Sequence, residues 1–230
     1  MKHSRSSAEQ IIRDATVERF RELWPDARII HEMNVEHGTS RADVVAVQPD
    51  RVWIAEIKSD RDKLDRLPGQ VADFAPACHG LIVVVHEKWT KSPGVEALKS
   101  GGTRQLPSPL DVALTGTRGR CEVWSYPETR HRSGFRGWSA PFQAQTPWFH
   151  RMLMLLWADE LRTVASTHRI SCGPRTPAYK LAPEISRLLP GRDIERAVCQ
   201  QLRSRRFAEA DPPILPDKSE EETPRYERSA

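Results

Sequence analysis

Apolar side chains in the first ninety residues change spacing from helical to strand-like and back. Ile12, Thr16, Phe20 and Leu23 fall at helical spacing, after a possible capping box at 7–10 and before Pro25. Strand-length apolar segments follow at 28–35, 44–47, 52–58 and 81–85, with a helix predicted over 65–77. The expected order is helix, three strands, helix and strand, which indicates an α/β domain.

Two charged residues, Glu56 and Lys58, interrupt the predicted hairpin of strands 44–47 and 52–58, and Asp43 directly precedes it. Side chains alternate along a strand, so Glu56 and Lys58 share one face with Val52 and Ile54, and the hairpin can place Asp43 opposite them. Charged groups are costly to bury unless they are paired or bound to metal. The sequence therefore favours a functional cluster at this end of the hairpin, and a structural cross-strand ion pair is the alternative.

Two of these residues have the chemistry of magnesium ligands. Carboxylates about 4 Å apart repel each other by a few kcal/mol at an effective dielectric near 20. A Mg²⁺ ion removes that repulsion, and it typically binds one or two carboxylates together with water and substrate phosphate oxygens. We therefore expect Asp43 and Glu56 to hold the metal. Lys58 then faces the scissile phosphate, where it orients water or neutralises charge.

This combination of an Asp, a β-turn and Glu56-Ile-Lys58 resembles the PD-(D/E)XK nuclease superfamily. The segment from Glu56 to Gln70, followed by 81–85, is similar to an uncharacterised family of bacterial and phage proteins within it. Ala42 replaces the Pro that often precedes the Asp. The resemblance covers about residues 7 to 90. It implies a restriction-endonuclease-like αβββαβ core with a central mixed sheet, and cleavage of DNA that depends on Mg²⁺, with Mn²⁺ as a substitute.

The resemblance also implies further site residues. An acid on the first strand or preceding helix completes the metal shell in similar nucleases; Glu32 is the first choice and Glu18 the second. Gln70 matches a Gln that touches metal-bound water or the DNA backbone, whereas Phe74 replaces the Tyr often found four residues later. Arg41 and Arg66 are candidate phosphate contacts, although an exposed helix arginine is the commoner explanation for Arg66.

The chain after residue 90 has a different character. Residues 90–117 show no clear period, 121–126 reads as a short strand, and the loop 129–139 mixes Arg130, Arg132 and Arg136 with two aromatic residues. That loop suits either a nucleic-acid surface or a loop pinned by its aromatic residues. Helices are then predicted over 148–164, 178–189 and 192–207.

The predicted C-terminal helices carry a basic stripe. Residues 146–210 hold eleven Lys and Arg against six Asp and Glu, a net of +5. The stripe lies on the last helix and comprises Arg192, Arg196, Arg203 and Arg206. It predicts a DNA-binding accessory, and a solvated face on a helical subdomain packed against the core is an equal alternative.

Composition sets the broader limits. A net charge of +4 is compatible with a nucleic-acid partner, and the four cysteines form no CxxC motif, which disfavours zinc. No segment reaches the length of a membrane span and no signal-peptide pattern is present, so we expect a cytoplasmic protein without a membrane partner. The expected units are a nuclease domain (1–140), a basic helical subdomain (146–210) and a disordered acidic tail (211–230).

The sequence thus predicts a metal-dependent DNA endonuclease. Two alternatives remain open. One is a nuclease-like module that binds DNA without cutting it. The other is an assembly protein of a phage or defence complex, with a homodimer or a protein partner held through the C-terminal helices.

Overall fold

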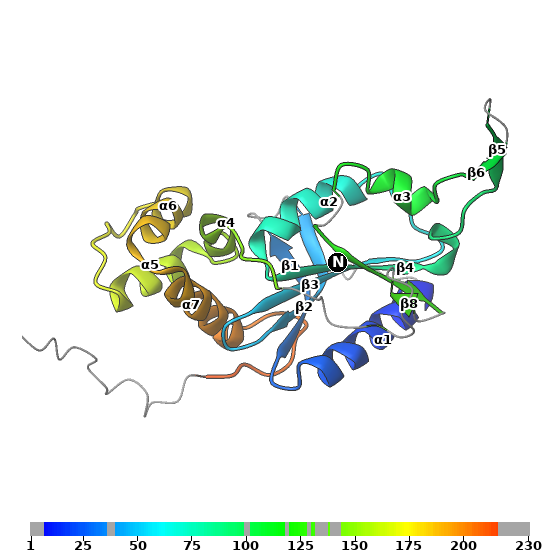
Figure 1. Ribbon diagram of the computed structural model, residues 1–230. Helices are drawn as coiled ribbons and strands as arrows, with labels where there is room; N and C mark the ends of the chain where they lie inside the picture. The colour runs from blue at the N-terminus through cyan, green and yellow to red at the C-terminus, as the bar shows by residue number, and fades with distance from the viewer. Residues whose placement is uncertain are drawn as a thin grey trace, which may run out of the picture.

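The computed structural model describes residues 7–35, 40–98, 102–117, 120–127, 130–131, 138 and 144–215. Helix α1 (Ser7–Leu23) comes first, and strands β1 (Arg28–Val35), β2 (Ser40–Val47) and β3 (Val52–Lys58) follow it. Helix α2 (Leu67–Phe74) and the short 3-10 helix η2 (Ala75–Ala77) then lead into β4 (Gly80–His86). The predicted order of the first six elements is confirmed (Figure 1).

The described strands form a mixed six-stranded sheet in the order β1-β2-β3-β4-β7-β8, where β7 is Glu122–Tyr126 and β8 is Arg130–His131. Strands β1, β2 and β3 are antiparallel neighbours, whereas β4 runs parallel to both β3 and β7. Lys58 lies beside Val85 in this register. The carboxyl ends of β3 and β4 therefore meet at the same end of the sheet.

Helices cover both faces of the sheet (Figure 1). On one face, Phe20 of α1 and Trp24, directly after its end, pack with Trp53 and Trp124, and the rings of Trp24 and Trp53 stack with centroids 4.4 Å apart. On the other face, Val71 of α2 joins a second buried cluster. Strand β3 contributes alternately to the two clusters, as its sequence predicts.

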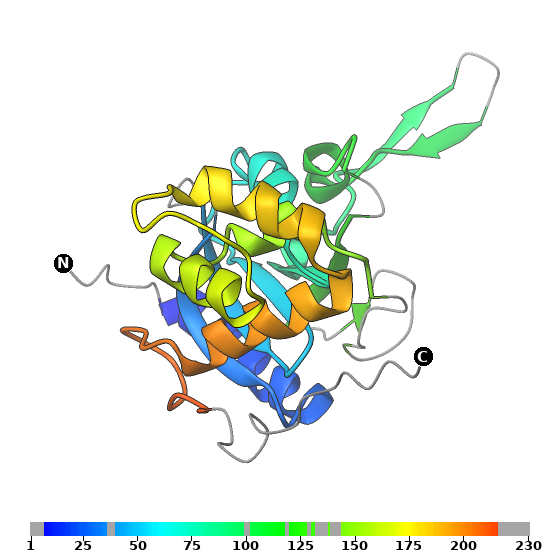
Figure 2. The same ribbon diagram turned by 90° about the vertical axis from the view of Figure 1, so that its left-hand side faces the viewer.

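Four helices follow the sheet: α4 (Phe149–Leu153), α5 (Ala158–Thr167), α6 (Ala178–Leu188) and α7 (Gly191–Ser204). They lie together on one side of the molecule (Figure 2). Their buried apolar residues belong to the same cluster as α2 and the sheet face beneath it. None of the described helices is both long and apolar enough to cross a membrane.

The prediction of one helix over 148–164 is wrong. Helix α4 ends at Leu153 and α5 begins at Ala158, and Met152, Leu153, Leu155 and Leu156 are buried on both sides of this break. The backbone N–H of Trp157 donates to Glu160 at 2.7 Å, which caps the start of α5.

Other predicted boundaries also need correction. The helix predicted over 65–77 starts at Leu67 and ends as the 3-10 helix η2. Residues 90–117, expected to be irregular, contain the hairpin β5 (Val95–Ala97) and β6 (Thr103–Gln105) and the short helix α3 (Pro109–Ala113). The two hairpin strands have only three, mostly exposed, residues each, so they leave no apolar alternation to detect.

The last predicted segments are only partly described. In the loop 129–139, Trp138 is buried and stacks on Trp124, which supports the pinned-loop interpretation for that residue. Residues 129, 132–137 and 139 of that loop lie outside the described residues, with Arg132 and Arg136 among them, and so does 216–230 of the predicted tail. The tail prediction starts too early, because Asp211 pairs with Arg21 and its backbone N–H donates to Ile29.

Candidate active site

The carboxyl end of β3 carries two buried charges on one face. Glu56 is 2% exposed and Lys58 is 5% exposed. The Lys58 ammonium donates to Glu56 Oε1 at 2.5 Å and to Gln70 Oε1 at 3.0 Å. The Gln70 amide donates to the same Glu56 oxygen at 2.5 Å. Helix α2 thus supplies Gln70 to the pair that β3 presents.

The second oxygen of Glu56 is the unusual atom of this group. Glu56 Oε2 is buried and has no hydrogen-bond partner among the described residues. Burial, followed by repulsion from Asp43, raises the pKa of Glu56 to about 8, against the opposing effects of Lys58 and Gln70. A buried acceptor without a donor costs desolvation free energy, and a bound cation or a proton on this oxygen would remove that cost.

Asp43 lies where β2 separates from β3. The ladder between these strands runs from the Val47–Val52 pair to the Val44–Ala55 pair. Beyond it, the Asp43 Oδ2 atom accepts the backbone N–H of Ile57 at 2.7 Å, in place of a backbone carbonyl. Burial raises the pKa of Asp43, although the Arg13 guanidinium and this N–H act in the opposite direction.

Glu32 lies opposite Asp43 on the neighbouring strand. The pairs between β1 and β2 stop at His31–Val44 and resume at Met33–Ala42, leaving Glu32 and Asp43 outside the ladder. Glu32 has φ 54°, a left-handed conformation that favours glycine. Its carboxylate pairs with Arg13 at 2.9 Å and with Arg41 at 2.6 Å. The local distortion thus places the carboxylate chosen from sequence beside Asp43.

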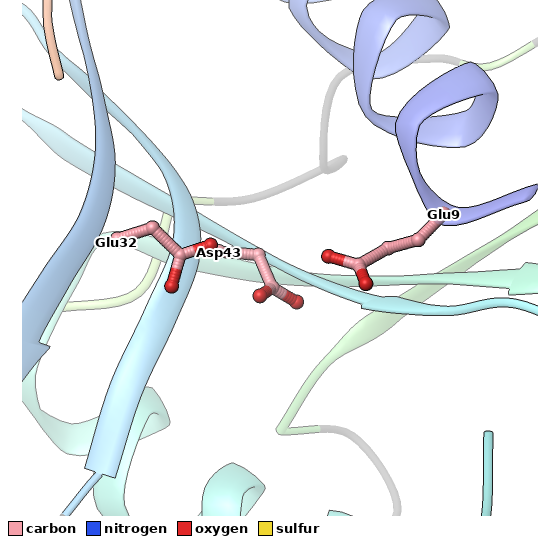
Figure 3. A group of neighbouring side chains, drawn as sticks. All are labelled: Glu9, Glu32 and Asp43. Carbon is pink, nitrogen blue, oxygen red and sulfur yellow. The ribbon is translucent and has the colours of Figure 1, made fainter. Parts of the chain in front are cut away.

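Two residues of α1 complete the group, and sequence reasoning missed both. The guanidinium of Arg13, whose side chain is fully buried, lies 2.8 Å from Glu9, 2.9 Å from Glu32 and 3.2 Å from Asp43. Oxygen atoms of these carboxylates lie within 4.8 Å of one another, and Figure 3 shows them converging from α1 and two strands. The signal was present in the sequence: Arg13 follows Ile12 on the inward side of the predicted helix, one turn after Glu9.

The helix therefore contributes Glu9 to the cluster instead of the second-choice acid, Glu18, which is exposed on another face of α1. We name the group formed by Glu9, Glu32 and Asp43 the acidic cluster. Oxygen ligands of this kind suit Mg²⁺ or Mn²⁺, and Glu56 Oε2 offers a further acceptor close by. The donor set therefore fits a divalent ion, but Arg13 pairs with all three carboxylates.

The described charges of the site nearly cancel without any metal. They belong to seven side chains: Arg13, Arg41, Lys58, Glu9, Glu32, Asp43 and Glu56. Three cations against four carboxylates leave a net of −1, and protonation of Glu56 below its pKa of about 8 removes that charge. Electrical neutrality alone thus does not require an ion here.

The arginines predicted to contact nucleic acid lie in two separate regions, one at the site and one at the opposite end of the sheet. Arg41 lies at the site through its pairing with Glu32, and Arg66 is exposed just before α2. The arginines of α7 lie elsewhere. Arg203 donates to the carbonyls of Asp26 and Val47, at the opposite end of β2 from the acidic cluster.

Two contacts define that opposite end further. Glu195 of α7 approaches His79, whose ring accepts the backbone N–H of Val52 at the start of β3. Val52 and Lys58 are the two ends of β3, so they lie about 20 Å apart along the strand. Arg192 and Arg196 are exposed on α7, whereas Arg206 falls beyond its end at Ser204. The predicted four-residue stripe is therefore interrupted, and the structure does not bring it to the site.

Comparison with known proteins gives one family similarity. Residues 2–93 match the family model described as bacteriophage P4 protein cII. The match covers less than half of the chain, and it includes α1, β1 to β4 and every residue of the site described above. No curated protein and no solved structure gives a significant match.

Proposed function

We propose that this protein is a divalent-metal-dependent endonuclease that hydrolyses phosphodiester bonds of DNA, with a PD-(D/E)XK-type, restriction-endonuclease-like core. The observation that carries the proposal is the convergence of Asp43, Glu56, Lys58 and Gln70 where β2 and β3 separate. The orphaned Glu56 Oε2 supports it, because a bound cation would satisfy that oxygen.

In this proposal the chain's own residues have separate tasks. Asp43 and Glu56 hold the ion, and Glu9 and Glu32 complete the acidic surroundings. A bound Mg²⁺ polarises the phosphate and lowers the pKa of a coordinated water. Gln70 fixes the direction of the Lys58 ammonium, which holds the attacking water or the developing phosphate charge. Arg41 and Arg66 contact flanking phosphates.

The element order gives independent support. A helix, three antiparallel strands, a second helix and a parallel fourth strand build the mixed sheet, and this is the order that the resemblance implies for a nuclease core. The similarity to the bacteriophage P4 protein cII model fits a phage or bacterial setting. It adds no chemistry to the proposal.

A second candidate is a DNA-binding module that has the same fold and does not cut. The observation that favours it is the near-neutral network around Arg13, which accounts for the buried charges without a metal. Structural ion networks of this kind also shift pKa values, so the shifted pKa of Glu56 cannot choose between the two candidates.

Lys58 separates the two candidates. Purified protein is incubated with linear, circular, single-stranded and branched DNA, in Mg²⁺, in Mn²⁺ and in EDTA. We expect cleavage only with a divalent ion. Lys58→Ala should lower the single-turnover rate about a hundredfold or more, with a much smaller loss of DNA affinity. Lys58→Arg should rescue little, since a planar guanidinium differs in shape from the ammonium that Gln70 orients.

Glu18→Ala is the matched control, because it removes an exposed acid of α1 outside the acidic cluster. It should cut at the wild-type rate. If the wild type binds every DNA without cutting any of them, the binding-module candidate replaces the nuclease. If Lys58→Ala lowers DNA affinity and the single-turnover rate by the same factor, Lys58 only binds phosphate and has no separate role in the transition state.

A further inference from the structure

Arg13 lies at the centre of the acidic cluster, where its guanidinium contacts three carboxylates and a backbone carbonyl. Its side chain is fully buried, one of its terminal nitrogens faces Glu9, Glu32 and Asp43, and the other donates to the backbone carbonyl of Asp43. Arginine cannot lose its proton under ordinary conditions. A fixed positive charge is therefore built into the acidic cluster, beside Asp43, which is one of the two carboxylates to which the proposed function assigns the metal ion.

The guanidinium and a metal ion need the same oxygen atoms. Mg²⁺ binds its oxygens at about 2.0–2.1 Å, so the ligands of one ion lie within about 4 Å of one another. The acidic cluster offers oxygens within 4.8 Å, and the Arg13 nitrogen lies 2.8–3.2 Å from each carboxylate. An ion shared by two of these carboxylates would occupy the space of that nitrogen and would also be repelled by it.

One nitrogen of the Arg13 guanidinium is not hydrogen-bonded within the described part of the chain. Its Nε atom is buried and has no hydrogen-bond partner among the described residues, which weakens the metal-free arrangement. Nearby, Glu56 Oε2 is an equally buried acceptor without a donor. Exchange of the guanidinium for an ion would relieve both defects, provided that the Arg13 side chain turned away.

We propose that Arg13 is a resident counter-ion that competes with the divalent ion for Glu9, Glu32 and Asp43. The inference rests on the proposed function. In the metal-free protein Arg13 keeps the carboxylates together and neutralised, and an ion enters only as the guanidinium leaves. Arg13 therefore positions the acidic cluster for folding and lowers its metal affinity.

The test is Mn²⁺ binding to the full chain after EDTA treatment and buffer exchange, measured by calorimetry and by thermal melting. Arg13→Gln should bind Mn²⁺ at least about tenfold more tightly than the wild type, since a competing charge has gone. It should also melt lower in EDTA and gain more from Mn²⁺ than the wild type does. Arg21→Gln is the control, because it removes another paired arginine of α1, far from the cluster.

Each other outcome has a definite meaning. Weaker Mn²⁺ binding by Arg13→Gln would overturn the competition and make the guanidinium an organiser of the ligands. Equal affinity would also overturn it and leave Arg13 a structural residue. If neither the wild type nor Arg13→Gln binds Mn²⁺, the proposed metal site itself fails.

If Arg13→Gln does not fold even with Mn²⁺ present, Mn²⁺ binding is measured with Arg13→Lys instead. An ammonium keeps the charge, but it cannot reproduce the bifurcated contacts of the guanidinium. Its Mn²⁺ affinity should exceed that of the wild type by a smaller factor than tenfold. An affinity at or below the wild-type value would overturn the inference.

Discussion

At the scale of single residues, Glu56 shows how burial and function are linked. It lies near the end of β3, after four apolar residues, and it is buried beside Lys58, which ends the strand. One of its carboxylate oxygens nevertheless has no hydrogen-bond partner among the described residues. The pKa of about 8 means that the metal-free carboxyl group keeps its proton at neutral pH. The site is therefore more nearly neutral in the folded protein than its sequence suggests.

This pKa predicts how stability depends on pH. The pKa of Glu56 rises from 4.5 in the unfolded chain to about 8 on folding, so between these values the folded protein holds a proton that the unfolded chain releases. The stabilising contribution is complete below pH 4.5 and is lost as the pH rises through about 8. One such proton gives a slope of at most about 1.4 kcal/mol per pH unit.

Glu56→Gln removes the titrating group. The free energy of unfolding of this mutant protein in EDTA should therefore vary less with pH than that of the wild type. Urea denaturation at intervals from pH 5 to pH 9 measures the difference. The raised pKa of Asp43 acts in the same direction and leaves a residual slope in the mutant. Parallel profiles for the two proteins would mean that Glu56 ionises normally in the folded state.

Glu32 provides a second prediction at this scale. Its φ of 54° costs a residue with a Cβ atom about 1 kcal/mol or more relative to glycine. Glu32→Ala and Glu32→Gly both remove the carboxylate, but only the glycine relieves the backbone. Urea denaturation should find Glu32→Gly more stable than Glu32→Ala by about 1 kcal/mol. If the alanine variant is the more stable one, Glu32 does not have the left-handed conformation.

At the scale of elements, the sequence predicted the structure best where one apolar period continues for a whole element. Helix α1 and strands β1, β3 and β4 are found at or within one residue of their predicted positions. The same alternation placed Glu56 and Lys58 on one face, whereas Glu32 and Gln70 were candidates only through the resemblance to a nuclease family. The prediction failed at 148–164, because buried apolar residues continue at 155 and 156, across the break between α4 and α5, and their period does not mark it.

The missed residues of the site have a similar explanation. Glu9 and Arg13 belong to a helix far from the hairpin in sequence, and only tertiary packing brings them to Asp43. Their i, i+4 spacing looks like an ordinary surface pair, which many helices have. A single sequence predicts the period of an element well, but the contacts between elements depend on the whole fold.

Helix α7 supplies the prediction for this scale. Arg203 is half-buried and its guanidinium bonds two carbonyl groups of the sheet end, whereas Arg192 and Arg196 are exposed. Arg203→Ala should therefore lower the urea midpoint, and Arg192→Ala and Arg196→Ala should leave it unchanged. If the two exposed residues contact phosphates, each mutation reduces the salt slope of duplex binding by about 0.9. If the salt dependence of duplex binding does not change, Arg192 and Arg196 face solvent and do not contact DNA.

At the scale of the whole molecule, the C-terminal helices and the sheet share a core. Val198 and Leu202 of α7 belong to the same buried cluster as Val45 and Val47 of β2. The end of α7 is tied to β1, since the Arg28 guanidinium donates to the carbonyls of Leu202, Arg203 and Arg205. Residues 209–211 then pair with the outer edge of β1. These contacts favour the packing alternative for the helices.

The shared core predicts the effect of truncation. A chain that ends at residue 145 would expose the sheet face beneath α4 and α7, and it would lose the segment that covers the edge of β1. Exposed apolar surface and an open strand edge both promote aggregation. We therefore expect this chain to be insoluble, or to lose cooperative unfolding when circular dichroism follows a urea titration.

The matched control is a chain that ends at residue 215, which removes 216–230 and keeps every contact described between α7 and the sheet. It should unfold with the wild-type midpoint and slope. The truncation at 145 also removes the basic helices of 146–210, whose net charge is +5, together with the acidic segment 211–230, so weaker DNA binding alone could not distinguish packing from recognition. Cooperative unfolding of the 145-residue chain near the wild-type midpoint would contradict the shared core and restore the helices as a separate accessory.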